Sequence, residues 1–218
     1  FTPNTKSGNI NMSYGVTVAY AVTKKLTIRS GINKVDYGYD TEDVAFSSSS
    51  SLASKGGQLS TINYAETSNT LTIASNIVTS EKYTTTNLAQ DVTAKSPTRD
   101  GFMSQQFGYL ELPVELNYAL LDKKFGVNII GGVSSLFLID NAVSLTSGDL
   151  TTEIGEANNI NDLNFSANMG LGLNYNFSQK VRFNVEPIFK YQLNTFSDVN
   201  GTFRPYSVGV YSGLTFKF

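Results

Sequence analysis

The chain has 218 residues, a formal net charge of −2 from 16 Lys and Arg against 18 Asp and Glu, and neither His nor Cys. The near-neutral charge offers no electrostatic basis for binding nucleic acid. Without His and Cys there is no Ser-His or Cys-His catalysis, no imidazole or thiolate metal site and no disulfide.

Seven segments alternate large apolar residues with small or polar ones, and this period of two predicts β-strands. The clearest is LNFSANMGLGLNYNF, in which Asn, Ser and Gly separate the large apolar residues. All seven exceed the usual strand of about 5–6 residues, and a tilted strand that crosses a bilayer needs about 9–11. In chain order we place them at 9–22, 25–39, 105–120, 125–139, 162–177, 180–196 and 204–218.

The connections between these segments alternate between short and long. Tight turns are predicted at Thr23-Lys24, Asp122 to Lys124 and Ser178-Gln179, whereas the connections at 41–104, 140–161 and 197–203 are longer. Outer-membrane barrels have short periplasmic turns and longer extracellular loops. We therefore expect the long loops to be extracellular and the C-terminus to be periplasmic.

The segment 41–104 is predicted to be a long extracellular loop inserted into a single barrel domain that spans residues 1–218. The Ser run at 47–51 favours partial disorder near its start. The stretch INYAETSNTLTIASNIVTSEKYTT alternates enough to predict an ordered hairpin, with strands at 69–75 and 75–85. Loops of this length are usually functional or disordered, so both partner recognition and simple shielding remain open for it.

The face opposite the apolar one carries the charges of the strands, and it separates two kinds of barrel. In a soluble lipocalin-like barrel the apolar face lines the interior, whereas in a membrane barrel it meets lipid and the polar face fills the lumen. Charges that share a narrow interior must be paired, and the set here is nearly balanced. It comprises Arg29, Glu111, Glu115, Arg182, Glu186 and Lys190, with Lys217 as a further member. We interpret it as a structural lumen network, with an ion or proton path as the alternative.

Four stretches resemble the PorT-like outer-membrane β-barrel family of Bacteroidota, whose barrels are of the small OmpA/OmpX type. These are SYGVTVAYAVTKKLTIRSGI, GYLELPVELNYAL, FGVNIIGGVSSLFL and RPYSVGVYSGLTFKF. The second contains the Tyr-Leu-Glu-(Ile/Leu)-Pro strand of that family, at Tyr109 to Pro113, and Phe218 resembles the C-terminal aromatic residue that the barrel-assembly machinery reads. The resemblance implies a bacterial outer-membrane protein, and it permits a role in an envelope-spanning signalling or secretion complex.

The predicted fold class is all-β, a transmembrane antiparallel up-and-down barrel. Single-chain outer-membrane barrels have an even number of strands, so we expect eight, of which seven lie in this stretch. The segments 9–22 and 204–218 both run inward. An outward-running strand is therefore expected before Phe1, as part of a longer chain, or else from another chain. Strands within 41–104 would extend a hairpin above the membrane and leave this parity unchanged.

No catalytic, cofactor or metal site is predicted. The carboxylates Glu111, Glu115 and Glu186 have no accompanying nucleophile motif. Three acidic clusters could bind Ca²⁺, but we interpret them as solvated loops, and the one at Asp198 to Gly201 resembles a calcium loop that lacks its remaining ligands and distal Glu. We expect a non-enzymatic barrel, embedded in outer-membrane lipid, that anchors and displays its surface loop and binds a protein partner through the extracellular loops or the missing N-terminal region. A narrow diffusion channel and a soluble lipocalin-like carrier are the alternatives. The acidic clusters are Asp36, Asp40, Glu42 and Asp43, then Glu153, Glu156 and Asp162, and finally Asp198 to Gly201.

Overall fold

The computed structural model describes residues 6–8, 10–48, 59, 61–65, 68, 71–74, 99–196 and 205–217. The chain divides into two compact units. We call residues 11–37, 107–140 and 159–218 the barrel unit, and residues 1–10, 38–106 and 141–158 the loop unit. Within the described residues, no helix has the length and apolar character needed to cross a membrane.

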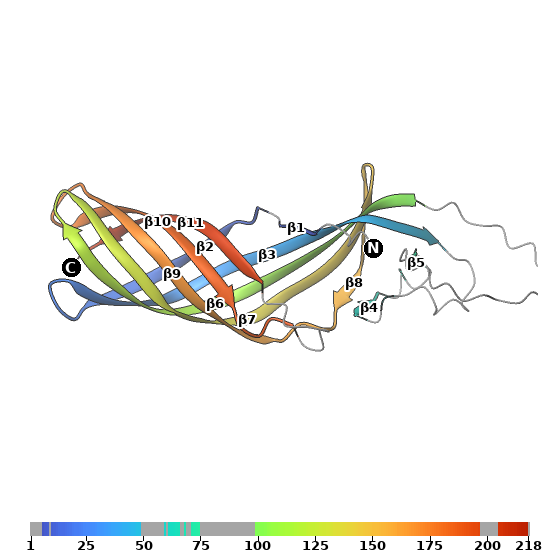
Figure 1. Cartoon of the computed structure of the whole chain (residues 1–218), viewed down its shortest axis with the longest axis horizontal. Coiled ribbons are helices and arrows are strands. Elements are labelled where there is room, and N and C mark those ends of the chain that lie inside the picture. The colour runs from blue at the N-terminus through green and yellow to red at the C-terminus, as the bar shows by residue number, and fades with distance from the viewer. Residues whose placement is uncertain are drawn as a thin grey trace, which may run out of the picture. The chain divides into compact units, whose positions relative to one another are not determined.

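The secondary structure of the described residues consists of β-strands, and each of the seven predicted segments corresponds to one of them (Figure 1). The main differences lie in β3, β6 and β7, which are longer than expected and contribute residues to both units. The strands are β1 (Lys6–Gly8), β2 (Ser13–Ala21), β3 (Leu26–Ser48), β4 (Ile62–Tyr64), β5 (Leu71–Ala74), β6 (Arg99–Asp122), β7 (Phe125–Ser147), β8 (Leu150–Ala157), β9 (Leu163–Asn176), β10 (Val181–Gln192) and β11 (Tyr206–Phe216).

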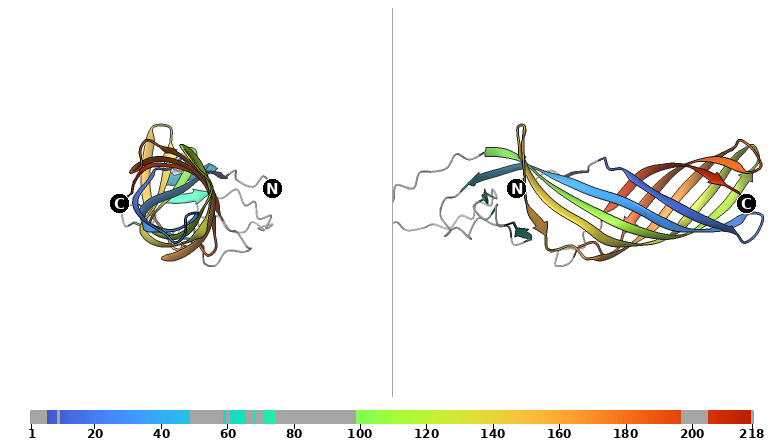
Figure 2. Two further views of the ribbon diagram at one scale, coloured as in Figure 1. Left: turned by 90° about the vertical axis from the view of Figure 1, so that its left-hand side faces the viewer. Right: turned by 180° about the vertical axis from the view of Figure 1, so that it is seen from behind.

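In the barrel unit, the strands lie side by side in the order β2-β3-β6-β7-β9-β10-β11. Each strand pairs with the next described barrel strand along the chain, which is an up-and-down meander. The register of β10 with β11 is antiparallel from Val181↔Phe216 to Tyr191↔Tyr206. Figure 2 shows how these strands curl. The sheet is thus all-β and antiparallel, as the alternating segments predict.

The apolar face of this sheet points outward and its polar face points inward. The side chains of Leu171 and Leu173 are each 51% exposed, whereas Asn168 and Glu186 are only 5% and 6% exposed. A lipocalin-like carrier requires the opposite arrangement, so that alternative was wrong. The structure also defines the faces of β7, where the sequence pattern fades, because Ile130 turns inward with no exposed surface.

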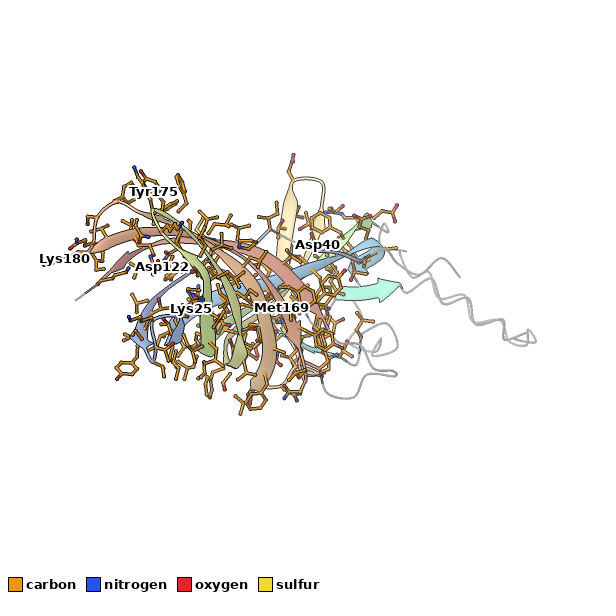
Figure 3. The ribbon with its side chains drawn as sticks, turned by 60° about the vertical axis from the view of Figure 1, so that its left-hand side comes forward. Lys25, Asp40, Asp122, Met169, Tyr175 and Lys180 are labelled. Atoms are coloured by element: carbon orange, nitrogen blue, oxygen red, sulfur yellow. The ribbon has the colours of Figure 1, made fainter. Side chains whose placement is uncertain are left out.

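Three short connections join β2 to β3, β6 to β7 and β9 to β10, and antiparallel pairing places all three at one end of the sheet. In the first, the hydroxyl oxygen of Thr23 accepts hydrogen bonds from the backbone N–H groups of Lys25 and Leu26, at 3.2 and 3.0 Å. Ser178 accepts the corresponding pair of bonds in the third. Figure 3 labels Lys25, Asp122 and Lys180, which lie at these connections.

The loop unit is built from the remaining parts of β3, β6 and β7 and from short strands added to them. β1 and β5 pair with β3, while β8 pairs with both β7 and β4. Because β3 reaches Ser48 and β6 begins at Arg99, the connection between them covers 49–98 rather than 41–104. The expected strand at 69–75 is present as β5, and the one at 75–85 lies outside the described residues.

Most of the buried side chains in the loop unit are apolar, whereas most of those in the barrel unit are polar. Its buried side chains come from both long and short strands, and none of those named here is more than 9% exposed. Burial of this kind is the usual source of stability for a domain in water. The residues are Val44, Phe46, Ile62, Met103, Val143, Leu145 and Ile154.

Candidate functional site: the polar interior of the barrel unit

The strand period of two brings the predicted charges to the inner face, and the register between neighbouring strands sets the depth of each charge. Arg29 on β3 lies between two carboxylates from different strands. Its Nε and Nη2 atoms donate to Glu115 Oε2 at 2.9 and 2.7 Å, and its Nη1 atom donates to Glu186 Oε1 at 2.8 Å. All three side chains are at most 14% exposed. One guanidinium thus connects β3, β6 and β10.

A second ion pair lies on the same inner face. Lys190 Nζ donates to both carboxylate oxygens of Glu111, at 2.6 and 2.7 Å, and the two side chains are 5% and 0% exposed. The ammonium also lies 5.1 Å from the centre of the Tyr211 ring, within the range of a cation–π contact. Asn33 Nδ2 donates to Glu111 Oε2 at 3.4 Å. The pair therefore links β3, β6, β10 and β11.

The structure places Arg182 apart from these two groups. Its Nε atom donates to Asn176 Oδ1 at 2.8 Å, and its Nη2 atom contacts Asp122 Oδ1 at 2.9 Å. Asp122 is 53% exposed, so this ion pair lies at the end of the sheet with the short turns. Lys217 is exposed. Of the six charges in the predicted network, five therefore form the two buried groups.

Neutral polar side chains fill other parts of the interior. Asn168 donates to Ser134 at 2.6 Å and accepts from Ser166 at 2.9 Å, while Asn164 donates to Thr195 at 2.9 Å. The paired strands also approach closely at Gly132, where a Cβ atom would lie 2.3 Å from the carbonyl oxygen of Val114. Glycine is thus required there by space.

The described interior of the barrel unit is packed mainly with polar side chains, together with a few apolar ones such as Ile130 and Leu136. The two buried groups contain two bases and three acids, which satisfy one another directly. Buried charges are tolerated when they are paired and hydrogen-bonded in this way. Sequence reasoning did not identify Tyr211, Asn33, Asp122 or Asn176 as partners. The first two share the inner face, so their strand positions were the available signal.

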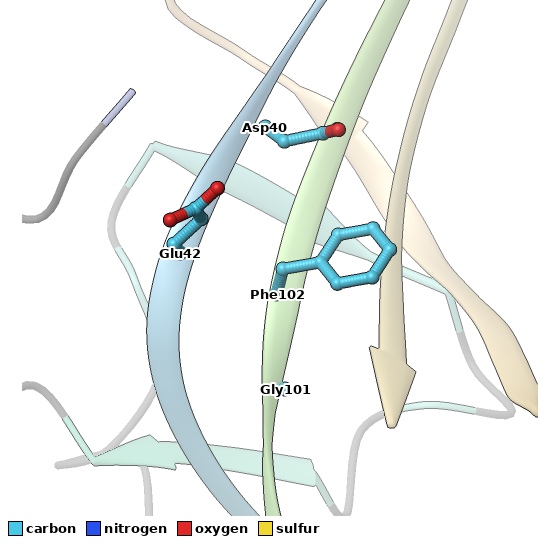
Figure 4. A pocket seen from close by; sticks show the side chains of 4 residues that line it. All are labelled: Asp40, Glu42, Gly101 and Phe102. Carbon is cyan, nitrogen blue, oxygen red and sulfur yellow. The ribbon is translucent and has the colours of Figure 1, made fainter. Parts of the chain in front are cut away.

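The loop unit has a recess of its own, lined by Asp40 and Glu42 on β3 and by Gly101 and Phe102 on β6 (Figure 4). Nearby, Tyr39 donates a hydrogen bond to Gln105 Oε1, and burial raises the pKa of the Tyr39 phenol to about 12. In the described part of the chain, no three acidic residues are grouped so that they could hold a metal ion. The Asp198 to Gly201 cluster lies outside the described residues.

Comparisons with known proteins agree with this geometry at the level of the family. No curated protein and no solved structure matches the chain. A family model described as an outer membrane protein beta-barrel domain matches residues 2–198, which is most of the sequence. The alternation, the outward apolar face and this match together lead to one conclusion: the chain belongs to the outer membrane protein β-barrel domain family.

Proposed function

We propose that this chain is a non-enzymatic outer-membrane barrel that anchors the loop unit at the cell surface, where the loop unit binds a protein partner. The observation that carries the proposal is the opposite construction of the two units. The barrel unit exposes a band of apolar side chains and buries mostly polar ones, as expected for a barrel in lipid. The loop unit buries apolar side chains and suits water.

Strand length supports the same division of roles. β3, β6 and β7 have 23 or 24 residues, whereas about 9–11 residues cross a bilayer. The excess residues belong to the loop unit, where β1, β4, β5 and β8 add to them. In this proposal the short turns and the C-terminus face the periplasm, and the loop unit lies outside the cell.

The packed interior supports anchoring rather than conduction. Tyr109, Glu111, Ile130, Leu136, Asn164 and Ser166 all face inward, and each has 0% exposed surface. Water therefore does not reach any of these six side chains. An eight-stranded barrel is just narrow enough for side chains to fill. We expect the ion pairs to act as a plug, which argues against the diffusion channel.

The resemblance to the PorT-like barrels of Bacteroidota bears on the class of partner. It supports a role as the surface sensor or a subunit of an envelope-spanning signalling or secretion complex. The recess of the loop unit combines the carboxylates of Asp40 and Glu42 with the half-exposed ring of Phe102. Such a combination fits a basic segment of a protein better than an acidic one.

Labelling of intact cells tests the proposed orientation and display. A single cysteine at Asp149, in the turn between β7 and β8, should react with a membrane-impermeant maleimide on whole cells. A cysteine at Lys123, in the turn between β6 and β7, should react only after the outer membrane is permeabilised. The reverse pattern would overturn the proposed orientation.

Affinity capture of the full polypeptide then tests partner binding. After crosslinking on cells, one partner protein should be recovered reproducibly with the unaltered chain. The yield of that partner should fall when Asp40 and Glu42 are changed to Asn and Gln. The matched control changes Asp122 to Asn, in the barrel unit beside the short turn between β6 and β7. Equal yields from all three proteins would contradict binding at the recess. In planar bilayers the purified barrel should be silent, and steady conductance would favour a channel.

A further inference from the structure

Positive charge is concentrated at the end of the barrel unit that carries the short turns. Among the described residues at this end, seven are basic and one, Asp122, is acidic. At the other end of the same unit, the described charges outside the two buried groups are one base, Lys34, and three acids. The acids are Asp36, Asp140 and Asp162. The seven bases, which we call the basic rim, are Lys24, Lys25, Lys123, Lys124, Lys180, Arg182 and Lys217.

Backbone hydrogen bonds place the separate turns of the basic rim next to one another. The carbonyl oxygen of Lys124 accepts a hydrogen bond from the N–H of Asn176, at 2.9 Å. The carbonyl oxygen of Lys180 accepts one from the N–H of Lys217, at 2.8 Å. The turn between β2 and β3 is joined to β6 in the same way. The bases therefore form one continuous arrangement along the end of the sheet.

The charge of the basic rim is largely unopposed within the described chain. Asp122 contacts Arg182 at 2.9 Å, so the one acid at this end is already paired. None of the six lysines lies within 4 Å of a described side-chain carboxylate. All six lysines are exposed. An anionic partner would complement this surface.

Each lysine of the basic rim also lies close to the lipid-facing side of a strand. Lys24 and Lys25 follow Val22, which is 47% exposed, and Lys123 follows Leu121, which is 42% exposed. The others lie within three residues of an outward-facing phenylalanine. Phe125, Phe177 and Phe216 are 66%, 63% and 60% exposed. Lysine side chains beside an apolar surface extend their ammonium groups toward the membrane–water interface, so these lysines reach the level of the lipid headgroups.

An aromatic cluster marks that level on β7 and β9. The ring of Tyr175 lies 5.0 Å from the rings of both Phe125 and Phe177. The ammonium of Lys124 lies 5.7 Å from the centre of the Tyr175 ring. Tyrosine rings are enriched at membrane–water interfaces. Figure 3 shows Tyr175 and Lys180 toward the same end of the barrel unit. The cluster thus places ammonium groups beside the phosphates of the surrounding leaflet.

We propose that the basic rim binds the headgroups of anionic phospholipids in the leaflet that surrounds the short turns. The inference rests on the anchoring of the barrel unit in a bilayer, but it is independent of the proposed orientation and of partner binding at the recess. An acidic protein would also complement the charge. The lysines, however, are spread over three turns and the end of β11, each beside an apolar side chain. Separate lipid headgroups fit this spacing better than one protein segment.

Fluorescence quenching in nanodiscs tests the lipid preference of the full chain. The sequence contains no Trp, so F177W provides a reporter at the basic rim. F137W provides a control on the lipid-facing side of β7, farther from the short turn, where Phe137 is 41% exposed. One Lys near an anionic membrane surface favours binding about fivefold. Brominated phosphatidylglycerol should therefore associate about fivefold more strongly than brominated phosphatidylcholine beside F177W, and equally beside F137W.

Charge substitutions then test whether the lysines cause this preference. The variant K123Q/K124Q/K180Q neutralises the turns beside F177W and should bring the association ratio of the two lipids close to one. Changing the same three lysines to Arg keeps the charge and should keep the preference. K34Q is the matched control, because Lys34 lies on β3 away from the short turns, and it should leave the ratio at F177W unchanged. The preference should also weaken at high salt, which screens exposed charges.

Three results would overturn the proposal, and they have different meanings. Equal quenching by the two lipids at F177W, or a preference that survives K123Q/K124Q/K180Q, would show that the lysines do not select anionic lipid. Binding of poly-glutamate in phosphatidylcholine nanodiscs, without a lipid preference, would assign the basic rim to an acidic protein. Absence of quenching at both reporters by either lipid would contradict the membrane anchoring itself, and the inference would fail with it.

Discussion

Changing Lys190 to Met should destabilise the folded barrel strongly, because it leaves the carboxylate of Glu111 buried without its cation. The ammonium lies 2.6 and 2.7 Å from the two carboxylate oxygens, and Glu111 has no exposed surface. Removing one partner of such a buried pair typically costs about 3–5 kcal/mol. We expect K190M to lose that amount of unfolding free energy.

A double variant separates the effect of losing the ion pair from the effect of losing side-chain packing. Changing Glu111 to Gln in the K190M background removes the unpaired charge, so most of the stability should return, with an interaction energy of about 3 kcal/mol. The matched control is K34M. Lys34 contacts Asp36 at 3.6 Å, and both side chains are 39% exposed, so its loss should cost at most about 1 kcal/mol.

Urea titration of the barrel folded into phospholipid vesicles provides the assay. The folded fraction at each urea concentration can be followed by the different migration of folded and unfolded barrels on unheated gels. The reasoning is refuted if K190M and K34M have the same unfolding midpoint. It is equally refuted if the double variant is no more stable than K190M.

Three further substitutions test other contacts by the same titration. Arg29 to Lys removes the guanidinium fork that reaches both Glu115 and Glu186, and a single ammonium cannot replace it. We expect a loss of about 1–3 kcal/mol of unfolding free energy, and unchanged stability would contradict the bridging role. Gly132 to Ala places a Cβ atom against the backbone of β6 and should cost about 1–3 kcal/mol. The control is Gly131 to Ala, whose Cβ atom meets no atom within 4 Å and should be harmless, so equal effects of the two would argue against the close approach. Leu171 to Arg puts a charge into lipid and should cost about 2–4 kcal/mol, whereas the control Leu150 to Arg in the loop unit should have little effect. A tolerated L171R would argue that this face does not meet lipid.

The alternating pattern predicted the barrel strands because lipid and lumen impose opposite demands on successive residues. Where that contrast ends, so does the pattern. Beyond Gly38, β3 continues through Asp40 and Glu42 into the loop unit, where polar residues are acceptable on the water-facing side. The same reason explains why β8, with Thr151 and Glu153, was not predicted as a strand.

The inner charges were predictable as a set but not as pairs. Alternation places Arg29, Glu115 and Glu186 on one face, but the depth of each depends on the stagger between neighbouring strands. The register of β3 with β6 brings Arg29 to Glu115 and Asn33 to Glu111. Arg182 lies one residue after the start of β10, and this position beside a turn gives it Asp122 as its partner.

The central claim is that the apolar face of each barrel strand meets lipid and the polar face meets the interior. Spin labels placed one at a time from Asn168 to Leu173, in barrels reconstituted in vesicles, test it directly through their collision rates with oxygen, which concentrates in lipid. The account predicts high collision rates at Met169, Leu171 and Leu173 and low rates at Asn168, Gly170 and Gly172. Low rates at the three apolar positions together with high rates at the other three would contradict it.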